Sequence, residues 1–431
     1  MLKNQKIGIV GFGLENQQFV EWLLSQETSD IVVFDKNDCT KKALEFGIKN
    51  VIWGQNYLQN LSDCDIIFKA PGIYSKLPEF EEFRKSGKLV LSSLQYFFDK
   101  FGDKIIAVTG TKGKTTTSSL IAHLLSKSGK TVHYCGNTTG ISPYQFWGEK
   151  DAIFVVELSS FQLQDLQNIN PKVSAVTNYY LDHQDQHISP EEYWASKDRI
   201  FEFQTSDNFA ILNAQISSHS DMHTLAQKII VNQKLVDFVA SRVQSPLLGE
   251  HNKYNLTLAL ASVLTFLTGD FDISGLDNSW TTKLQDYKGV EMRLEKFTQN
   301  DKITVYDDGA ATEPQAVISA IKALTNNDQK LWLWISGKDK GGDLQELADL
   351  IKSVGDRIRV EYCGEVGQNL AKLLGVNCQK QSLKEKLDDL QKVGLGDFEG
   401  NICLSPCGSS FDEFDNYKQR SAFWKSAFKS L

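Results

Sequence analysis

The chain has 431 residues, of which 41% are hydrophobic and 23% are charged, and its formal net charge is -8. A chain of this length exceeds what one hydrophobic core usually organises, so we expect two or three domains. The acidic balance argues against a nucleic-acid-binding surface, which needs a basic stripe, and favours a small substrate.

Neither a targeting segment nor a membrane span is evident in the sequence. The N-terminus runs directly into a strand pattern without the apolar core of a signal peptide, and no run of about twenty apolar residues follows. We therefore expect a cytoplasmic protein without a membrane partner, and a monomer. Seven cysteines without a C-x-x-C pair suit reduced, mostly buried thiols better than a disulfide framework or a zinc cluster.

The first domain is expected over residues 1–92, where strand and helix patterns alternate. Strands are predicted at residues 7–10, 31–34 and 65–68, and a helix at residues 16–24. This alternation predicts a small parallel sheet covered by helices.

A glycine turn follows the first predicted strand. Gly11 and Gly13 resemble the start of a dinucleotide fingerprint, but Asn16 stands where its third glycine belongs. Asp35 follows the second strand, as a ribose-binding acid would. A dinucleotide cofactor, a nucleotide-like ligand with a diphosphate, and glycines that serve only the turn all stay open. The sequence favours the diphosphate ligand.

The sequence GTKGKTTT at residues 110–117 is the most informative motif of the chain. It follows an apolar stretch at residues 104–109 and precedes a helical pattern. A buried strand, a glycine-rich turn and a helix N-terminus in that order place backbone N–H groups around a phosphate. Lys114 would reach the terminal phosphates, and Thr115 would offer its hydroxyl to Mg²⁺. Val108 stands where the full P-loop pattern has its first glycine, so the motif is a shortened form. The alternative to a phosphate site is an ordinary glycine-rich turn that contains lysines.

A second apolar run, at residues 152–156, stops at Glu157. Ligands bind at the carboxyl ends of strands in open α/β sheets, so Glu157 is a candidate magnesium ligand rather than a surface acid. A further strand is predicted at residues 173–177. His183 and His187 follow it, four residues apart, and the spacing leaves open whether they bind a metal or are solvated.

The third domain is expected over residues 291–431, and the second over the intervening residues 93–290. Strands are predicted at residues 303–306, 331–335, 359–362 and 401–404, and helices at residues 314–324 and 344–354. We therefore predict an α/β protein of three domains. These are an N-terminal Rossmann-like sheet, a central P-loop ATPase domain and a C-terminal Rossmann-like domain.

Nine motifs together resemble the Mur ligases, the ATP-dependent amide-forming enzymes of peptidoglycan synthesis. They are GTKGKTTT at 110, CGNTTG at 135, VELSSFQL at 156, NYYLDHQDQH at 178, YWASKDRI at 193, GEHNKYN at 249, EMRLE at 291, SGKDKGGD at 336 and LSPCGSSFDEFDNYKQR at 404. They occur in family order across all three expected domains. The string after Glu157 resembles the branch of the family that adds D-glutamate to UDP-N-acetylmuramoyl-L-alanine.

The resemblance implies an ATP-dependent acid–amino-acid ligase. Such an enzyme transfers the γ-phosphoryl group of ATP to a substrate carboxylate, and an incoming amine then displaces phosphate from the acyl phosphate to give an amide. Catalysis of this kind positions two anions in line and neutralises their repulsion, so cations must be abundant.

The resemblance also assigns the ATP and metal residues. The nucleotide would contact Gly110, Thr111, Lys112, Gly113, Lys114, Thr115, Thr116, Asn252, Asn255, Arg293 and Asp308. Thr115 and Glu157 would hold one Mg²⁺ ion, and His183 would hold a second. Without the resemblance, Lys112 is a solvated lysine and Asn252 a helix cap.

Lys197 matches the lysine that carries a carbamate in this family. A neutral amine that reacts with carbon dioxide becomes an anion, so a side chain that would repel a metal becomes a metal-facing acceptor. Without the resemblance, Lys197 is an exposed helix lysine. The catalytic residues implied are Lys114, His183 and Lys197, while His187 keeps a structural role.

The substrate residues are implied in the same way. The uridine diphosphate side would contact Leu14, Glu15, Asn16, Asp35, Lys36, Pro71 and Gly72, and Asn137 would face the muramoyl part. Ser159 and Gln162 are also implied to bind substrate. D-Glutamate would contact Thr312, Lys340, Ser410, Phe411 and Tyr417. A lysine with hydroxyl donors suits its second carboxylate.

One departure from the family pattern concerns the segment after the third domain's first strand. The family has a lysine where this chain has Ala310, and Glu313 adds a negative charge nearby. Either Lys338 or Lys302 compensates, or turnover is weakened, or the acceptor amino acid differs. A degenerate Mur-like nucleotide-binding protein therefore stays open, as does a nicotinamide-dependent oxidoreductase built on the glycine turn. Folylpolyglutamate synthase shares the P-loop, but the first-domain sheet does not suit it.

Overall fold

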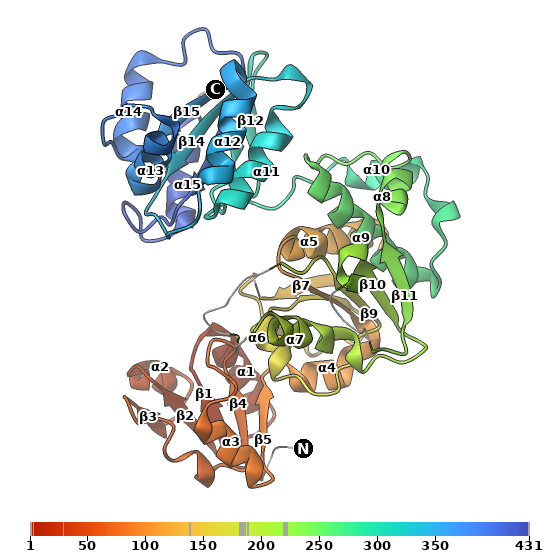
Figure 1. The fold of residues 1–431 in the computed structure, drawn as a ribbon. Helices are drawn as coiled ribbons and strands as arrows, with labels where there is room; N and C mark the ends of the chain where they lie inside the picture. The colour runs from red at the N-terminus through yellow and green to blue at the C-terminus, as the bar shows by residue number, and fades with distance from the viewer. Residues whose placement is uncertain are drawn as a thin grey trace. The chain divides into compact units, whose positions relative to one another are not determined.

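The computed structural model describes residue 2 and residues 4–28, 30–137, 139–180, 187, 189–218 and 223–429. Within them, three sheets with covering helices follow one another along the chain (Figure 1). The predicted α/β class is confirmed. No described helix is both long and apolar enough to cross a membrane.

The first sheet contains five parallel strands in the order β3-β2-β1-β4-β5. They are β1 (Ile7–Val10), β2 (Ile31–Asp35), β3 (Val51–Trp53), β4 (Ile66–Lys69) and β5 (Leu89–Ser92), with helices α1 (Leu14–Ser25), α2 (Thr40–Glu45) and α3 (Pro78–Lys85). Phe19 and Leu23 of α1 pack in one apolar cluster with Ile9, whereas Phe80 of α3 packs with Ile67 in another. The helices α1 and α3 therefore cover opposite faces of this sheet.

The second sheet contains six parallel strands in the order β11-β10-β9-β6-β8-β7. The strands are β6 (Ile105–Thr109), β7 (Val132–Gly136), β8 (Ile153–Glu157), β9 (Val173–Val176), β10 (Phe209–Asn213) and β11 (Gln227–Val231). The helices are α4 (Gln95–Phe101), α5 (Lys114–Lys127), α6 (Ser160–Gln164), α7 (Pro190–Glu202), α8 (Gln233–Ala240), α9 (Glu250–Thr268) and α10 (Asn278–Leu284). Every residue of β6, β8 and β9 is buried, as expected of parallel strands covered on both faces.

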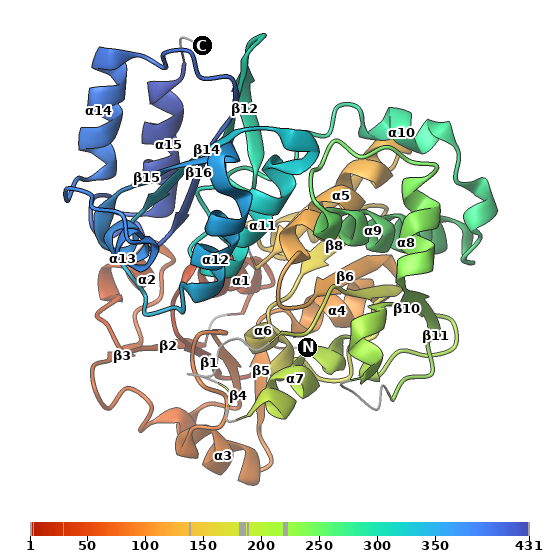
Figure 2. The same cartoon turned by 45° about the horizontal axis from the view of Figure 1, so that its top comes forward.

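The third sheet has the order β12-β13-β16-β14-β15, and only the pairing of β12 with β13 is antiparallel among its described strands. Its strands are β12 (Glu295–Gln299), β13 (Ile303–Asp307), β14 (Leu331–Ser336), β15 (Ile358–Tyr362) and β16 (Gly400–Cys407). Helices α11 (Pro314–Leu324), α12 (Gln345–Val354) and α13 (Gly364–Leu374) pack on one face, and α14 (Leu383–Val393) and α15 (Tyr417–Ala427) on the other (Figure 2). Successive residues of β14 divide between these faces, with Leu333 on the first and Trp334 on the second.

Short 3₁₀ helices connect several of these elements. They are η1 (Leu61–Asp63), η2 (Gly102–Lys104), η3 (Pro143–Phe146), η4 (Ala214–Ser218), η5 (Ile273–Gly275), η6 (Asn326–Asp328) and η7 (Gly355–Arg357).

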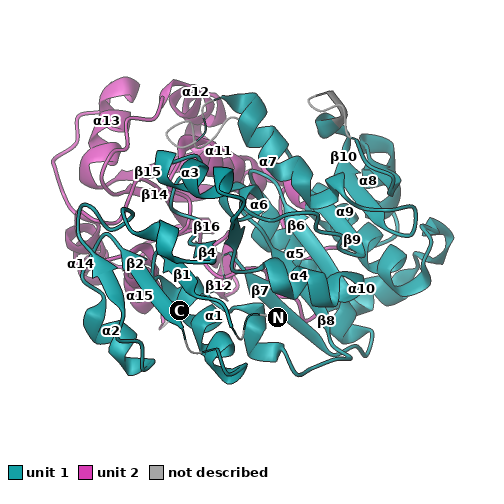
Figure 3. Cartoon of the chain, turned by 90° about the horizontal axis from the view of Figure 1, so that it is seen from below, with its two compact units in different colours: residues 1–244, 254–284 teal, residues 245–253, 285–431 magenta. Residues whose placement is uncertain are grey.

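The chain forms two compact units (Figure 3). The first contains residues 1–244 and 254–284, and the second contains residues 245–253 and 285–431. The first two sheets share a unit because one apolar cluster runs through both. Within it, ring centroids of Phe19 and Tyr144 lie 5.1 Å apart, and those of Phe97 and Phe154 lie 4.9 Å apart. The boundaries after residues 92 and 290 remain predictions.

Candidate active site

The phosphate loop lies between β6 and α5, as the motif predicts. Gly110 has φ 141° and Gly113 has φ 85°, conformations that favour glycine. A Cβ atom at Gly110 would lie 1.9 Å from Thr177 Oγ1, and one at Gly113 would lie 2.5 Å from Asn255 Oδ1. Glycine is therefore required at both positions by conformation and by space.

Residues that follow β9 hold this loop from outside. The Thr111 and Lys112 N–H groups donate to the carbonyl and the side-chain oxygen of Asn178, at 2.9 and 2.8 Å. The Thr177 hydroxyl donates to the Lys112 carbonyl at 2.6 Å. These bonds fix the N-terminus of α5, where backbone N–H groups and the helix dipole favour an anion.

Two lysine ammonium groups converge on one carbonyl of the loop. Lys114 Nζ and Lys197 Nζ each donate to Gly110 O at 3.0 Å, and Lys114 also donates to Thr111 O at 3.0 Å. Lys197, on α7, is 1% exposed, and its ammonium lies 4.5 Å from the centroid of the Tyr193 ring. The interpretation of Lys197 as an exposed helix lysine is therefore wrong, because the fold buries it beside the phosphate loop.

Glu157 ends β8 with its side chain fully buried. Tyr134 Oη donates to Glu157 Oε2 at 2.8 Å, and Asn137 Nδ2 donates to Oε1 at 3.2 Å. The Thr115 hydroxyl lies 3.4 Å from Oε1. The carboxylate is thus held next to the first turn of α5, at the strand end that the sequence predicts.

Tyr134 is not among the predicted site residues. It lies on β7, whose residues apart from Cys135 are only partly buried and show no continuous apolar run. The spacing gives no signal for it, because its contact with Glu157 depends on β7 pairing with β8. Asn137, predicted to face the muramoyl part, donates to Glu157 in this structure. Its contact with the muramoyl part stays a prediction.

Of the two candidate histidines, His183 lies outside the described residues. His187 is buried, with Nε2 3.1 Å from Ser160 Oγ and Nδ1 3.1 Å from Gln164 Nε2. Its ring stacks on Phe161 at a centroid distance of 5.4 Å. This packing supports the structural interpretation of His187. Among the residues that the structure describes, no cluster of three His, Cys, Asp or Glu side chains suited to a metal is found.

Glu15, Ser159 and Gln162, all predicted to contact substrate, lie together. Gln162 Nε2 donates to Glu15 Oε2 at 2.6 Å, and Ser93 Oγ donates to Glu15 Oε1 at 2.9 Å. Burial raises the pKa of Glu15, and the bonds from Ser93 and Gln162 oppose that shift. Ser159 and Gln162 also form a capping box at the start of α6. These groups therefore join α1 of the first sheet to the helix that follows Glu157.

The glycine turn of the first sheet packs against the turn at residues 70–73. A Cβ atom on Gly11 would lie 2.7 Å from Ala70 Cβ. Asn16 Nδ2 donates to Gly11 O at 2.7 Å, and the Phe12 N–H donates to Asp35 Oδ2 at 2.7 Å. Asn16, at the position of the third glycine of a dinucleotide fingerprint, thus stabilises the glycine turn by a side-chain hydrogen bond. The remaining predicted residues here are exposed or half-buried: Leu14, Lys36, Pro71 and Gly72.

Asn252 and Asn255 both lie on α9. Asn252 Nδ2 donates to Leu248 O at 2.7 Å, at the start of that helix. Asn255 Oδ1 accepts from the Thr117 hydroxyl at 3.3 Å, and it is the atom that a Cβ on Gly113 would meet first. Asn255 therefore lies beside the phosphate loop.

Asp308 follows β13 in the second unit, and the exposed Arg293 precedes β12. Asp308 Oδ1 accepts from the Leu294 N–H at 3.0 Å, and Oδ2 accepts from the Ser405 hydroxyl at 2.8 Å. Burial raises the pKa of Asp308 to about 7, while the Ser405 and Leu294 bonds and the Arg293 charge oppose the shift.

The residues predicted to hold the amino acid follow different strands of the third sheet. Thr312 follows β13, Lys340 follows β14 and Ser410 follows β16. The Cys407 N–H donates to Ala311 O, and Lys338 pairs with Ser409 in both directions, so these loops meet at one edge of the sheet. Ser410 is buried, whereas Lys340, Phe411 and Tyr417 are exposed.

The structure also bears on the missing lysine at Ala310. Lys302 precedes β13 and forms an ion pair with Glu399 at 2.9 Å, so it lies at the opposite end of that strand. The suggestion that Lys302 compensates is therefore wrong, whereas Lys338 lies at the same sheet edge as Ala310. Arg420, which the sequence did not single out, is a buried cation whose guanidinium donates to Gly309 O at 3.2 Å.

Comparisons with known proteins agree with this geometry. Residues 6–77 match the MurD N-terminal domain family, and residues 108–238 match the Mur ligase middle domain family. The UDP-N-acetylmuramoylalanine–D-glutamate ligase of Clostridium kluyveri is 30% identical over 464 aligned positions, covering 100% of this chain and 98% of the relative. The enzyme of the same name from Desulfatibacillum aliphaticivorans is 29% identical, with 97% of each chain covered.

Among solved structures, the UDP-N-acetylmuramate–alanine ligase of Thermotoga maritima has a similar fold. Its TM-score is 0.55 at 18% sequence identity, covering 99% of this chain and 100% of that one. At this identity the likeness supports the three-domain α/β fold alone.

Proposed function

The chain belongs to the Mur ligase family, and on that premise we propose that it is the ATP-dependent ligase that joins D-glutamate to UDP-N-acetylmuramoyl-L-alanine in peptidoglycan synthesis. The observation that carries the proposal is the match to relatives of that name over the whole chain. The phosphate loop with its buried acid and lysines supports it chemically. We further propose a cytoplasmic monomer whose three parts, residues 1–92, 93–290 and 291–431, bind the uridine nucleotide, ATP and the amino acid.

The phosphate loop supplies the positive field for the first step. Lys114 places its ammonium group 3.0 Å from Gly110 O, at the N-terminus of α5. A triphosphate bound to the loop's N–H groups would draw the Lys114 ammonium from the loop carbonyls onto phosphate oxygens, since charge-assisted bonds are the stronger ones. Lys114 would thereby offset the repulsion between the γ-phosphate and the substrate carboxylate.

The residues around Glu157 fit a magnesium ion. A carboxylate and a hydroxyl, from Glu157 and Thr115, are hard oxygen donors that already lie 3.4 Å apart. When bound there, Mg²⁺ would neutralise phosphate charge. Tyr134 and Asn137 keep the carboxylate oriented toward the loop. His183 is proposed as a ligand of a second ion.

Lys197 suits carbamate formation because it is buried. In carbamate formation a neutral lysine amine attacks carbon dioxide, and burial shields the product from bulk water. A new N–C bond forms, one proton leaves, and the side chain becomes an anion. Its place beside the phosphate loop would let that anion serve a metal ion bound near the phosphates.

The reaction then proceeds in two displacements. An oxygen of the substrate carboxylate attacks the γ-phosphorus, the bond to ADP breaks, and an acyl phosphate forms. The amine nitrogen of D-glutamate attacks the acyl carbon, phosphate leaves, and an amide remains after loss of a proton. Lys340 and Ser410, at the edge of the third sheet, are proposed to bind the second carboxylate of D-glutamate.

A coupled assay tests the proposal. The protein is incubated with ATP, Mg²⁺ and UDP-N-acetylmuramoyl-L-alanine, and phosphate release is measured with D-glutamate, L-glutamate and other amino acids in turn. We expect release that requires both the uridine nucleotide and D-glutamate. Release with another amino acid instead would identify a Mur-type ligase with a different acceptor.

Ala310 supports one alternative, a Mur-like protein that binds nucleotide without forming the amide. That protein would bind ATP with Mg²⁺ but release no substrate-dependent phosphate. If the assay gives this result, Ala310→Lys should restore release, because it returns a cation to the loop after β13.

A further inference from the structure

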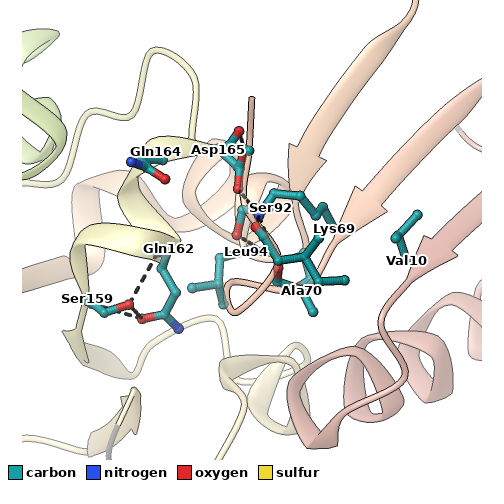
Figure 4. Close-up of polar contacts among 12 residues, drawn as sticks. Val10, Lys69, Ala70, Ser92, Leu94, Ser159, Gln162, Gln164 and Asp165 are labelled. Atoms are coloured by element: carbon teal, nitrogen blue, oxygen red, sulfur yellow. Dashed lines mark hydrogen bonds and ion pairs between the residues drawn. The ribbon is translucent and has the colours of Figure 1, made fainter. Parts of the chain in front are cut away.

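Lys69, at the end of β4, is a buried cation that no motif points to. Its side chain is 0% exposed, and its ammonium lies 2.7 Å from Asp165 Oδ2, whose side chain is 2% exposed. The two residues come from the first sheet and from the end of α6, and Figure 4 shows their side chains pointing toward one another.

The Lys69 ammonium also binds both ends of the turn at residues 70–73. Lys69 Nζ donates to Ala70 O at 3.0 Å and to Ile73 O at 2.5 Å. An ammonium has three protons, so Asp165 and these two carbonyls use all of them. Pro71 and Gly72, the residues proposed to contact the uridine diphosphate, lie between the two carbonyls. Lys69 therefore sets the shape of that turn.

This turn also supports the other side of the proposed uridine site. A Cβ atom on Gly11 would lie 2.7 Å from Ala70 Cβ and 2.9 Å from Ile73 Cδ1. A shift of residues 70–73 would therefore be felt by the glycine turn. The turn that Lys69 holds is therefore in close contact with the glycine turn.

Asp165 ties this arrangement to the central sheet. It is the C-terminal cap of α6, which begins shortly after Glu157, and its backbone carbonyl accepts from the Ser92 N–H at 3.0 Å. Its carboxylate also accepts from the Ser75 hydroxyl, which Arg84 Nη2 approaches at 3.1 Å. Asp165, which anchors the turn at residues 70–73, thus ends the helix that follows the strand of Glu157.

Stability alone is a weak explanation for this pair. Two charges lose their hydration when buried, and well-packed apolar residues often serve stability as well as a buried ion pair. What an apolar side chain cannot do is donate to two carbonyls of a turn. We propose that Lys69 is a positioning residue, held by Asp165, that fixes residues 70–73 in the shape that receives the uridine diphosphate. This inference rests on the proposed function.

The test compares four full-length variants by steady-state kinetics and by calorimetric titration with UDP-N-acetylmuramoyl-L-alanine. Lys69→Met and Asp165→Asn each break the pair, and a double variant carries both changes. Lys76→Met is the matched control, because Lys76 follows the same turn and forms a more exposed ion pair with Glu192.

We expect Lys69→Met to raise KM and Kd for the uridine substrate about tenfold or more, as loss of a charged donor implies. KM for ATP should change little. The double variant should regain thermal stability relative to Lys69→Met, because it removes a buried carboxylate whose remaining cation, Arg84, is 3.7 Å away. It should nevertheless keep the raised KM. Asp165→Asn, which retains the ammonium, should have a smaller effect, and Lys76→Met none.

A double variant that recovers both stability and uridine-substrate affinity would show that the pair only stabilises the fold, and would overturn the proposal. If the double variant does not fold, Asp165→Asn provides the test. Equal changes in the KM for the uridine substrate and the KM for ATP would then overturn the proposal. These outcomes differ from failure of the proposed function, in which the unmodified protein releases no substrate-dependent phosphate.

Discussion

The phosphate loop and the edge of the third sheet are built in different ways. At the loop, three charged side chains are held by other groups of the fold: Lys114 and Lys197 by Gly110, and Glu157 by Tyr134 and Asn137. At the edge of the third sheet, the proposed amino-acid ligands Lys340 and Phe411 extend from loops into solvent. The first region is organised before substrate binds, whereas the second takes its shape from short loops.

The two regions also treat a buried acid at a strand end differently. Glu157 receives bonds from side chains of β7, of the residue that follows it and of α5. Asp308 receives two bonds, and burial still raises its pKa to about 7. A carboxyl group that titrates near neutrality, as Asp308 does, makes its region sensitive to pH.

Lys114→Ala is the strongest test of whether the phosphate loop is organised before substrate binds. If the loop is organised for phosphate, losing its central cation should lower kcat by about a hundredfold to a thousandfold, the cost of removing one preorganised charge stabiliser. Phosphate release with saturating ATP measures this. The control is Lys112→Ala, which removes an exposed lysine of the same loop and should cost far less. Equal losses would mean that general positive charge, not placement, supports the reaction.

Glu157→Gln and Tyr134→Phe together test how the acid is held. Glu157→Gln keeps the shape but removes the charge, so the Mg²⁺ concentration needed for half-maximal activity should rise about a hundredfold. Tyr134→Phe removes only the 2.8 Å donor to Glu157, and the same requirement should rise about tenfold. A Tyr134→Phe enzyme with unchanged Mg²⁺ dependence would show that Tyr134 does not orient the acid.

Sequence and structure agree best where one contiguous segment makes the site. GTKGKTTT and the acid after residues 152–156 were readable, because a strand, a turn and a helix that are neighbours in sequence form them. Tyr134 and the pair Lys69–Asp165 were not, because the first contact depends on the pairing of β7 with β8 and the second on the packing of the end of α6 against the end of β4. The short edge strands β3 and β12 escaped prediction for another reason: β3 has an apolar run of only three residues, and β12 has a single apolar residue, Phe297.

Lys197→Ala tests the carbamate proposed beside the phosphate loop. Activity should fall about a hundredfold, because the variant can form no carbamate. Added formate or acetate should restore part of it, since a small carboxylate fits the space of the missing anion. The matched control is Lys127→Ala, on the last turn of α5, which should neither lose activity nor respond to carboxylates. Full activity of Lys197→Ala without additive would rule out the carbamate.

The smallest expected effect is on thermal stability, and it concerns Asp308 in the second unit. Asp308 has a pKa raised to about 7 in the folded protein, against an ordinary value of 3.8. Between these values the folded state holds a proton that the unfolded state has lost, so the stability of the second unit falls as pH rises toward 7 and is then level. Asp308→Asn removes that penalty. Its melting temperature relative to the unmodified protein should therefore increase by several degrees between pH 5 and pH 8, on top of a pH-independent offset from the altered bonds to Leu294 and Ser405. Asp301→Asn, an exposed acid before the same strand, should show a difference that does not change with pH. If both variants track the unmodified protein at every pH, the Asp308 carboxyl is ionised in the folded state and the predicted pH dependence is wrong.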